Sequence, residues 1–220
     1  MEKLNHTDIK VNGGKFYLFF KRLFDIVASF VAIVILSPIL LILAILVKST
    51  SKGPILFKDV RVGRQGKIIK VLKFRSMYVD AETNIRSYLS DEEYQRWLVE
   101  RKIDNDPRIT KIGKFIRKTS LDELPQLFNI FIGDMSIVGS RPITQLELEE
   151  NFNEKEKVII LSSRPGLTGY WQVYGRSDVD YASGERQRLE MEYYKNRSIF
   201  FDFKLMFLTI PAVLSHKGAQ

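Results

Sequence analysis

Two adjacent acidic residues, Asp122 and Glu123, stand within the stretch RKTSLDELPQLFNIFIGDMSIVGSRP, which covers residues 117–142. Pro125 follows them, and proline is well tolerated in the first turn of a helix. We therefore expect a helix that begins around Ser120 to Asp122, with both carboxylates at its positive end. The same spacing fits a capping box, in which Ser120 and Glu123 bind backbone donors and the role is purely structural.

Basic residues in other segments favour a chemical role for this acid pair. Guanidinium groups match phosphate oxygens, and a helix N-terminus is also a phosphate-binding place. Together with a carboxylate they suit phosphoryl transfer through a covalent aspartyl phosphate, with a divalent cation offsetting the charge. The basic candidates are Arg117, Arg141, Arg164 and Arg176, with Lys73 further upstream.

The composition excludes several other chemistries. The 220 residues include no cysteine, so thiol nucleophiles and thiolate metal sites are impossible. The two histidines, His6 and His216, lie near the ends, which argues against a histidine zinc site or a Ser-His-Asp triad within the domain. The net charge of +8 predicts anionic partners such as acidic lipid headgroups or phosphorylated substrates. Nucleic acid ranks last, because no nucleic-acid-binding motif is present.

An apolar run near the N-terminus predicts a membrane anchor. It extends over residues 23–47 with Asp25 as its one ionisable residue, which is longer than a signal-peptide core, and no clean cleavage site follows. A straight helix needs about 20 apolar residues to span the bilayer, so a kinked single span is one interpretation.

Ser37 and Pro38 favour a different path for this anchor. Proline in a helix interior removes a hydrogen bond and clashes with the preceding turn. Basic residues also flank the run on both sides, from Lys15 to Arg22 and from Lys48 onward. Because basic flanks stay on the cytoplasmic side, a single span would have to export one of them. We therefore expect a re-entrant helix, broken at Ser37-Pro38, that enters and leaves through the same leaflet.

The rest of the chain predicts an α/β fold, helix-rich with a small sheet. Two short strands should surround a turn at residues 63–66, and residues 133–142 should form a loop. The segment 164–176 should be a loop with a short strand, and residues 199–214 an apolar helix that lies in the membrane interface or in the core. Further helices are expected in residues 80–103 (broken near Ser90), 111–118, 121–131, 143–163 and 179–198. The predicted division is a tail over 1–22, a re-entrant helix over 23–50 and a membrane-seated catalytic domain over 51–220.

These motifs resemble the bacterial sugar transferases, the monotopic phosphoglycosyl transferases that load a sugar-1-phosphate onto polyprenyl phosphate. The resemblance rests on KRLFDIVAS followed by LSPIL, LKFRSM, DPRITKIGKFIRKTSLDELPQLFNIFIGDMSIVGSRP, RPGLTGYWQVYGR and YYKNRSIFFDFKLMFLT. It covers nearly the whole chain after Lys15, and DELPQLFN followed by GDMS is its most specific part. The family's anchor is a re-entrant helix broken at a Ser-Pro pair, which agrees with the charge pattern.

The resemblance implies a role for each candidate. Asp122 would be the nucleophile that attacks the β-phosphate of a UDP-sugar and expels UMP, and Glu123 would bind Mg²⁺ on the diphosphate. Polyprenyl phosphate would then take the phosphosugar from Asp122. The implied phosphate-binding residues are Lys73, Arg117 and Arg141, and Arg164 and Arg176 would contact nucleotide or sugar.

The resemblance also implies a setting. The enzyme would sit in the bacterial inner membrane with its active site on the cytoplasmic face, at the first membrane step of polysaccharide, capsule or glycan assembly. Its partners would be a UDP-hexose (TGYWQVYGRSDVDY is similar to galactose-type members), polyprenyl phosphate and membrane lipid. A homo-oligomer and downstream glycosyl transferases stay open. Ser140 replaces the proline that the family commonly has before Arg141, which could loosen that loop.

Two alternatives compete with the transferase. A membrane-bound Mg²⁺-dependent phosphohydrolase would use water to resolve the aspartyl phosphate, and would release UMP continuously without a lipid acceptor. A non-catalytic membrane scaffold for glycan assembly would tolerate Asp122→Asn.

Overall fold

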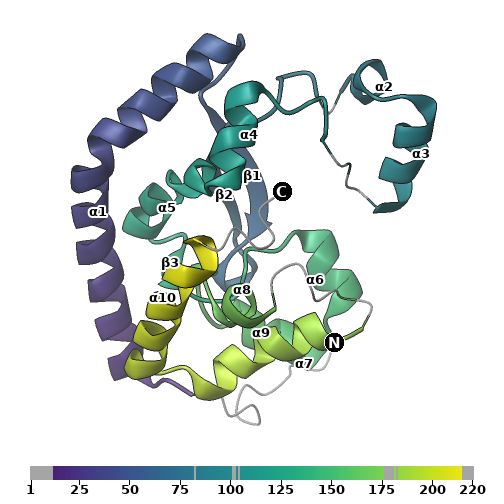
Figure 1. Cartoon of the computed structure of the whole chain (residues 1–220). Helices are drawn as coiled ribbons and strands as arrows, with labels where there is room; N and C mark the ends of the chain where they lie inside the picture. Colours follow the sequence, from purple (N-terminus) through teal and green to yellow (C-terminus); the bar gives the residue numbers. More distant parts are fainter. Residues whose placement is uncertain are drawn as a thin grey trace. The chain divides into compact units, whose positions relative to one another are not determined.

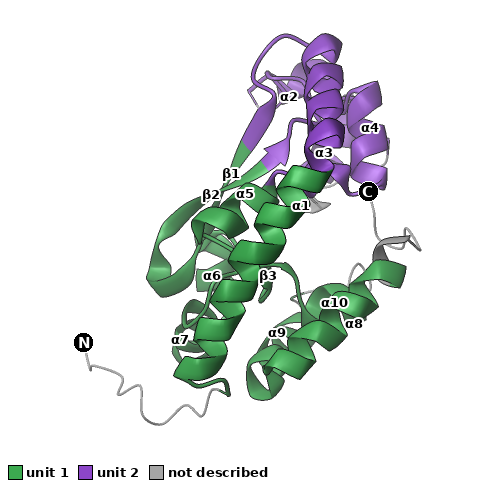
Figure 2. Ribbon diagram, turned by 90° about the vertical axis from the view of Figure 1, so that its left-hand side faces the viewer, with its two compact units in different colours: residues 1–35, 58–72, 126–218 green, residues 36–57, 73–125, 219–220 purple. Residues whose placement is uncertain are grey.

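The structure is a computed structural model of the chain, and it describes residues 12–81, 83–100, 103, 105–175, 181 and 183–214 (Figure 1). The chain divides into two compact units, which Figure 2 shows in different colours. Residues 1–35, 58–72 and 126–218 make up what we call the first unit, and residues 36–57, 73–125 and 219–220 the second unit.

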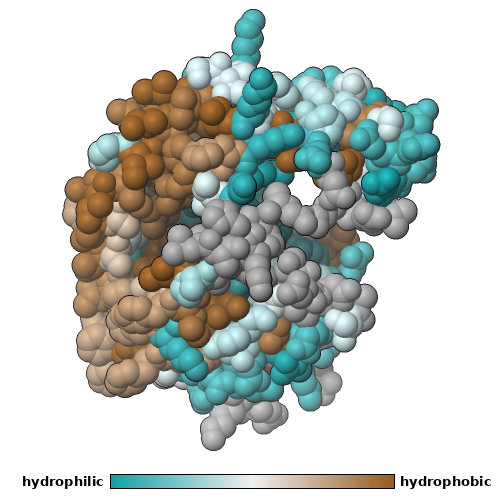
Figure 3. Space-filling model, viewed as in Figure 1, coloured by the Kyte–Doolittle hydropathy of each residue, from teal (hydrophilic) through white to brown (hydrophobic). Residues whose placement is uncertain are grey.

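The apolar run forms helix α1, Lys15–Thr50. Among the described residues, α1 is the one helix that is both long enough and apolar enough to cross a membrane. Many apolar side chains of α1 are exposed, and they form the brown surface along this helix in Figure 3. The helix continues without interruption through Ser37 and Pro38, so the expected division into two separate arms is not confirmed. The path of α1 in a membrane stays a prediction.

A pair of strands follows α1, as the sequence predicts. Strand β1, Leu56–Val62, pairs with β2, Ile68–Phe74, and the turn between them contains the 3₁₀ helix η2, Arg64–Gly66. The Gly63 N–H donates to the Lys67 carbonyl oxygen across this turn (2.7 Å).

Three helices of the second unit have the predicted positions. Ser90 separates α2, Ile85–Tyr88, from α3, Asp91–Glu100, which confirms the expected break. Ser90 and Glu93 cap α3, because each side chain binds the other residue's backbone N–H. Helix α4, Lys111–Lys118, begins and ends where the basic amphipathic pattern predicts.

The first unit contains a second, parallel pair of strands. Residues expected to form a loop include strand β3, Ser136–Val138, which pairs with β4, Gly166–Thr168, so that part of the loop prediction is wrong. In the register, Ser136 lies opposite Gly166. A Cβ on Gly139 would lie 2.7 Å from the Gly166 nitrogen, so glycine is required for this close approach.

Helices supply the rest of the first unit. Between the parallel strands come α6, Gln145–Asn151, and α7, Glu154–Leu161, each started by a capping box. Helix α8, Tyr170–Tyr174, was not expected inside the glycine- and aromatic-rich segment. Helix α9, Glu185–Asn196, fits the prediction. The buried core of this unit is formed by Val62, Val138, Ile143, Leu148, Phe152, Ile160, Met191, Tyr193, Tyr194 and Leu205.

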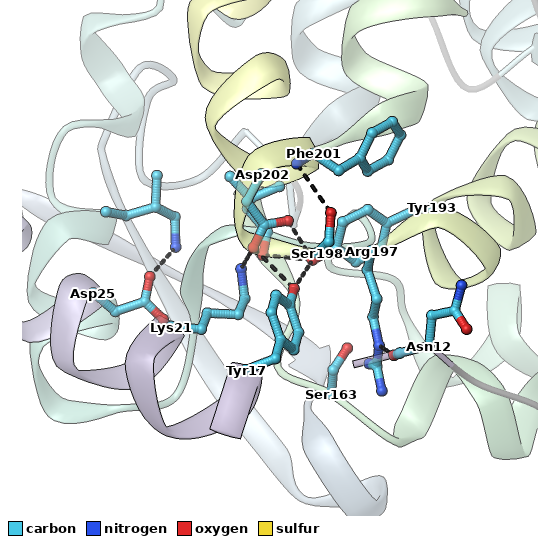
Figure 4. A network of polar contacts seen from close by, with 12 residues as sticks. Asn12, Tyr17, Lys21, Asp25, Ser163, Tyr193, Arg197, Ser198, Phe201 and Asp202 are labelled. Carbon is cyan, nitrogen blue, oxygen red and sulfur yellow. Dashed lines mark hydrogen bonds and ion pairs between the residues drawn. The ribbon is translucent and has the colours of Figure 1, made fainter. Parts of the chain in front are cut away.

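A polar network joins the start of α1 to the last helix, α10, Ile199–Leu214 (Figure 4). The Asp202 carboxylate accepts hydrogen bonds from Lys21 Nζ (2.6 Å), the Tyr17 hydroxyl (2.8 Å) and the Tyr193 hydroxyl (3.1 Å). The Asp25 Oδ1 accepts the Ile137 N–H (3.0 Å). These polar residues of α1 and α10 therefore help to hold the two helices in place within the first unit.

Helix α10 has one apolar face outside the core. Phe200 is 87% exposed, and Phe203 and Phe207 on the same face are also exposed, whereas Leu205 is fully buried. The predicted helix is confirmed. Its location in a membrane interface stays a prediction.

Candidate active site

The acid pair lies on a tight turn of the second unit. Ser120 has a left-handed backbone (φ 56°), and the 3₁₀ helix η3, Leu121–Glu123, follows it. Ser120 makes no side-chain capping hydrogen bond, so the capping-box alternative is wrong. A 3₁₀ helix, not an α-helix, begins at the expected place, and the α-helix α5, Gln126–Ile132, begins after the acid pair. Left-handed backbone at a residue other than glycine is uncommon, and such residues cluster at active sites.

Two leucines hold this turn in place. Leu121 and Leu124 pack against a buried apolar cluster that we call the anchor cluster. In a 3₁₀ helix, side chains three residues apart lie on one face, so both leucines face the cluster and the acids between them do not. The anchor cluster consists of Leu43, Val47, Phe74 and Ile116. Since Leu43 and Val47 belong to α1, the end of the apolar helix and the acid pair share one packed core.

Cationic side chains lie close to the acids. Lys73 Nζ is 3.8 Å from Glu123 Oε1. Arg117, on α4, donates from Nε to the Ser76 hydroxyl (2.8 Å), and its charge acts on Asp122. The structure therefore brings together four of the sequence-predicted residues, which are Lys73, Arg117, Asp122 and Glu123.

The surroundings of Asp122 shift its protonation equilibrium. Burial and then the charge of Glu123 raise the pKa of Asp122 to about 6, while Lys73 and Arg117 act in the opposite direction. The carboxyl group is still mostly ionised at pH 7. It is thus a partly desolvated carboxylate beside two cations, a state that suits a nucleophile.

The motif KFRSM supplies more of the site than the sequence analysis recognised. Phe74 packs in the anchor cluster and Ser76 positions Arg117. The buried Arg75 donates to the carbonyl oxygens of Ser51 (2.7 Å) and Lys52 (3.0 Å), just after the end of α1. Lys73 and Ser76 therefore serve the acid pair, whereas Phe74 and Arg75 contact the end of α1. The missed signal was the placement of Arg75 and Ser76 beside Lys73.

A glycine on α4 sets the position of Arg117. The Thr110 hydroxyl caps α4 by accepting the Gly113 N–H (2.9 Å), and the Thr110 N–H donates to the Ser76 carbonyl oxygen (3.0 Å). A Cβ on Gly113 would lie 1.9 Å from that same carbonyl oxygen. Only glycine allows α4 to approach Ser76 this closely, and Arg117 follows one turn later.

A second acid of this unit has a different environment. Asp106 is buried and receives both Nε and Nη2 of Arg108, at distances of 2.6 to 3.1 Å, together with the Arg108 backbone N–H (2.9 Å). Burial acts to raise the pKa of Asp106, but the hydrogen bonds from Arg108 outweigh it and lower the pKa. This acid is fully engaged in the fold.

The donor set fits a magnesium ion that arrives with a substrate. No group of three or more acidic or histidine side chains able to hold a metal occurs among the described residues. Mg²⁺ commonly uses one or two carboxylates together with substrate phosphates. Glu123, whose side chain is 41% exposed, could provide one such oxygen.

The other predicted residues lie elsewhere in the chain. Arg141 and Arg164 belong to the first unit, and Arg176 lies outside the described residues. Arg141 is 5.1 Å from the Trp171 ring centre, and Arg164 Nε donates to the Gly133 carbonyl oxygen after α5 (2.6 Å). Ser140 accepts two hydrogen bonds, one at its carbonyl from Gly166 (2.7 Å) and one at its hydroxyl from Tyr194 (2.9 Å), which restrain the loop before Arg141.

A comparison with protein families identifies the class of the chain. The family model described as bacterial sugar transferase matches residues 16–216. The chain therefore belongs to the bacterial sugar transferases, and the prediction that it is an enzyme of this class is confirmed.

Individual relatives are similar over most of the chain. The chain is 42% identical to the exopolysaccharide production protein ExoY of Rhizobium meliloti, over 90% of this chain and 87% of that protein. It is 44% identical to an undecaprenyl-phosphate galactose phosphotransferase of Salmonella typhimurium and 39% to a UDP-glucose:undecaprenyl-phosphate glucose-1-phosphate transferase of Escherichia coli. It covers about nine tenths of its own length in both cases, but only 42% and 41% of those longer proteins. These lipid-carrier relatives and the long apolar helix support membrane association.

Proposed function

We propose that this chain transfers a hexose-1-phosphate from a UDP-sugar to polyprenyl phosphate through a phosphosugar on Asp122. The observation that carries the proposal is the partly buried Asp122 on a strained turn, next to Glu123 and under the influence of Lys73 and Arg117. The names of two relatives, with undecaprenyl phosphate as acceptor and galactose or glucose as sugar, support the substrate classes.

In the first step, an Asp122 carboxylate oxygen attacks the β-phosphorus of the donor. The bond from that phosphorus to the bridging oxygen breaks, and the electron pair leaves with UMP. Lys73 and Arg117 offset the negative charge that the donor brings. Mg²⁺, held by Glu123 and the diphosphate, would neutralise further charge on the phosphate oxygens. Asp122 needs no proton transfer, because it is already ionised at neutral pH.

In the second step, a phosphate oxygen of the polyprenyl carrier attacks the phosphorus of the phosphosugar. The bond to Asp122 breaks and the carboxylate is free again. The product is polyprenyl diphospho-sugar, the lipid-linked start of a polysaccharide, capsule or glycan. Splitting the transfer into two displacements lets two unlike substrates use one site in turn.

The anchor cluster supports a place for this reaction at the membrane surface. Leu43 and Val47 of α1 pack in the same core as Leu121 and Leu124 beside the acids. If Ser37-Pro38 turns α1 back within one leaflet, both basic flanks stay on the cytoplasmic face of the inner membrane. Residues 51–220 would then form the catalytic domain on that face, with the exposed apolar face of α10 in the interface.

The test is single-turnover release of UMP by the detergent-purified chain, with Mg²⁺ and a panel of UDP-hexoses but no lipid. We expect a stoichiometric burst with one donor, and a mass increase of one phosphosugar on the peptide that contains Asp122. Asp122→Asn should abolish the burst, whereas Asp91→Asn, a change to another acid of the second unit, should retain it.

Other outcomes would assign a different function. Continuous UMP release without lipid would favour the phosphohydrolase, because water would then resolve the intermediate. No release with any donor, even when polyprenyl phosphate is supplied, would exclude the enzyme and favour the membrane scaffold.

A further inference from the structure

An arginine of α9 in the first unit lies against two aromatic rings, one from α8 and one from the segment between α8 and α9. The Arg186 guanidinium carbon lies 4.4 Å from the centre of the Trp171 ring and 4.0 Å from the centre of the Tyr181 ring. A guanidinium at such distances is attracted by the negative faces of both rings. Arg186 is therefore fixed in orientation before any ligand binds.

One edge of this guanidinium has no hydrogen-bond partner among the residues that the structure describes. Its Nε and Nη2 atoms are both hidden from solvent. The same two atoms bind a carboxylate in Arg108, which holds Asp106, and in Arg188, which holds Glu185 (2.7 and 2.5 Å). This edge is the fork that matches two oxygens of one carboxylate or phosphate.

The two rings that clamp Arg186 carry further unpaired donors. Trp171 Nε1 and the Tyr181 hydroxyl are also buried and have no partner in the described part of the chain. Indole nitrogen donates only, and a tyrosine hydroxyl can donate as well as accept. A ligand that satisfies these groups must therefore bring several acceptor oxygens.

The charges around Arg186 are compatible with an anion. The carboxyl of Glu190 on α9 accepts the Arg141 N–H (3.4 Å), and burial raises the pKa of Glu190 to about 7, so its negative charge is incomplete at neutral pH. Glu147 is bound by Arg61 (3.1 Å). The positive charge of Arg141 also acts on Arg186. In a site shielded from water, a charged hydrogen bond is stronger than at the surface.

We propose that Arg186, with the Trp171 and Tyr181 donors, is a subsite of the first unit that binds the phosphate of a nucleotide. The identity of the ligand rests on the proposed function, whereas the preference for an oxyanion rests on the fork and the unpaired donors. The phosphate of the polyprenyl acceptor fits this subsite less well. That phosphate carries a long apolar chain, and none of the three residues offers an exposed apolar surface for such a chain.

The test uses tryptophan fluorescence of the full chain in detergent. The sequence has two tryptophans, so Trp97→Phe leaves Trp171 as the reporter. In this background, UMP, uridine, inorganic phosphate and a short polyprenyl phosphate are each titrated at constant Mg²⁺. Arg186→Lys keeps the charge but removes the fork. Arg188→Lys, two residues later on α9 with its fork occupied by Glu185, is the matched control.

We expect Arg186→Lys to weaken UMP binding about 30-fold, as two charged hydrogen bonds are reduced to one, and to leave uridine binding within about twofold. Arg188→Lys should change neither. Tyr181→Phe removes a single oxygen and should weaken UMP but not uridine, so it tests the subsite even if Arg186→Lys does not fold. Unchanged circular dichroism spectra and thermal midpoints show that each variant is folded.

Three results would overturn the subsite: no UMP binding by the parent protein, equal losses for UMP and uridine, or a loss confined to the polyprenyl phosphate. The burst on Asp122 is a separate measurement. A normal burst together with unchanged UMP affinity in Arg186→Lys would reject the subsite and leave the transferase intact. If the parent protein gives no burst but Arg186→Lys selectively loses UMP affinity, the transferase is rejected and the subsite is retained.

Discussion

Asp106 and Asp122 belong to the same unit, one before and one after α4 in the sequence. Their environments shift the pKa values of the two carboxyl groups in opposite directions. Asp106 is clasped by Arg108 through three side-chain contacts, and its pKa is lowered. Asp122 has cations nearby, yet Arg117 gives its Nε to Ser76, and burial raises the pKa of Asp122. The acid that serves the fold is held directly by a guanidinium, whereas the guanidinium near Asp122 donates to a serine instead.

The largest effect on stability should come from breaking the paired acid. Asp106→Asn leaves the buried Arg108 guanidinium without its counter-charge, and we expect a loss of about 3 kcal/mol in the free energy of unfolding. The UMP burst per folded molecule should change little. Chemical denaturation in detergent, with the burst measured on the same sample, checks both. A lost burst at full stability would show that Asp106 acts in the reaction.

The support of the turn that carries the acid pair can be tested at Gly113. Gly113→Ala places a methyl group 1.9 Å from the Ser76 carbonyl oxygen, so α4 must move and carry Arg117 with it. We expect a loss of about 2 kcal/mol in stability together with a weaker burst. Gly14→Ala is the control, because no atom of the described residues lies within 4 Å of a Cβ there. Equal effects of the two substitutions would contradict the role of this close approach.

The raised pKa predicts how the first step depends on pH. A nucleophilic carboxylate is lost as pH falls through the pKa of Asp122, which is about 6. The rate of UMP release at low donor concentration, which reports the free enzyme, should therefore drop about tenfold between pH 7 and pH 5. Stopped-flow release at a series of pH values measures this. A rate that is flat down to pH 4.5 would mean that the carboxylate is not desolvated in solution.

The smallest expected effect is a gain in folding stability on replacing Asp122, whereas replacing Asp106 should lower the stability. Because the pKa of Asp122 is raised in the folded state, its ionised form is unfavourable there, and this cost is present above pH 6 and disappears as pH falls toward 4. Asp122→Asn should thus raise stability by about 1 kcal/mol at pH 7, after a discount for partial exposure, and by nothing at pH 4. Thermal midpoints at the two pH values decide this. A destabilised Asp122→Asn at pH 7 would place Asp122 with Asp106 as a structural acid.

Much of the local structure was predictable because it depends on near neighbours in sequence. The limits of α4, the break at Ser90 and the turn between β1 and β2 follow from short patterns of charge, apolar spacing and glycine. The three-residue strand β3 was missed because its partner, β4, lies about 30 residues away and three residues carry almost no periodicity.

The site itself was predictable in composition but not in construction. The residue types around Asp122 indicated phosphoryl transfer, and the resemblance assigned Asp122, Glu123, Lys73 and Arg117. The backbone of Ser120, the leucines that hold the turn and the Arg117–Ser76 contact depend on tertiary packing, which overrides the helix-start signal of Pro125. The fork of Arg186 could not be recognised without coordinates, because its significance lies in having no partner among the residues that the structure describes.

The link from Arg75 to the end of α1 has a consequence for the lipid environment. Arg75 and the anchor cluster fix the acid pair relative to the last turns of the apolar helix. In the proposed membrane arrangement, the height of the carboxylates above the hydrocarbon is set by the depth of α1 in the bilayer, and this depth depends on the hydrophobic thickness. Transfer to a polyprenyl phosphate held at the headgroup level should accordingly respond to acyl-chain length in reconstituted bilayers, while the lipid-independent UMP burst should not.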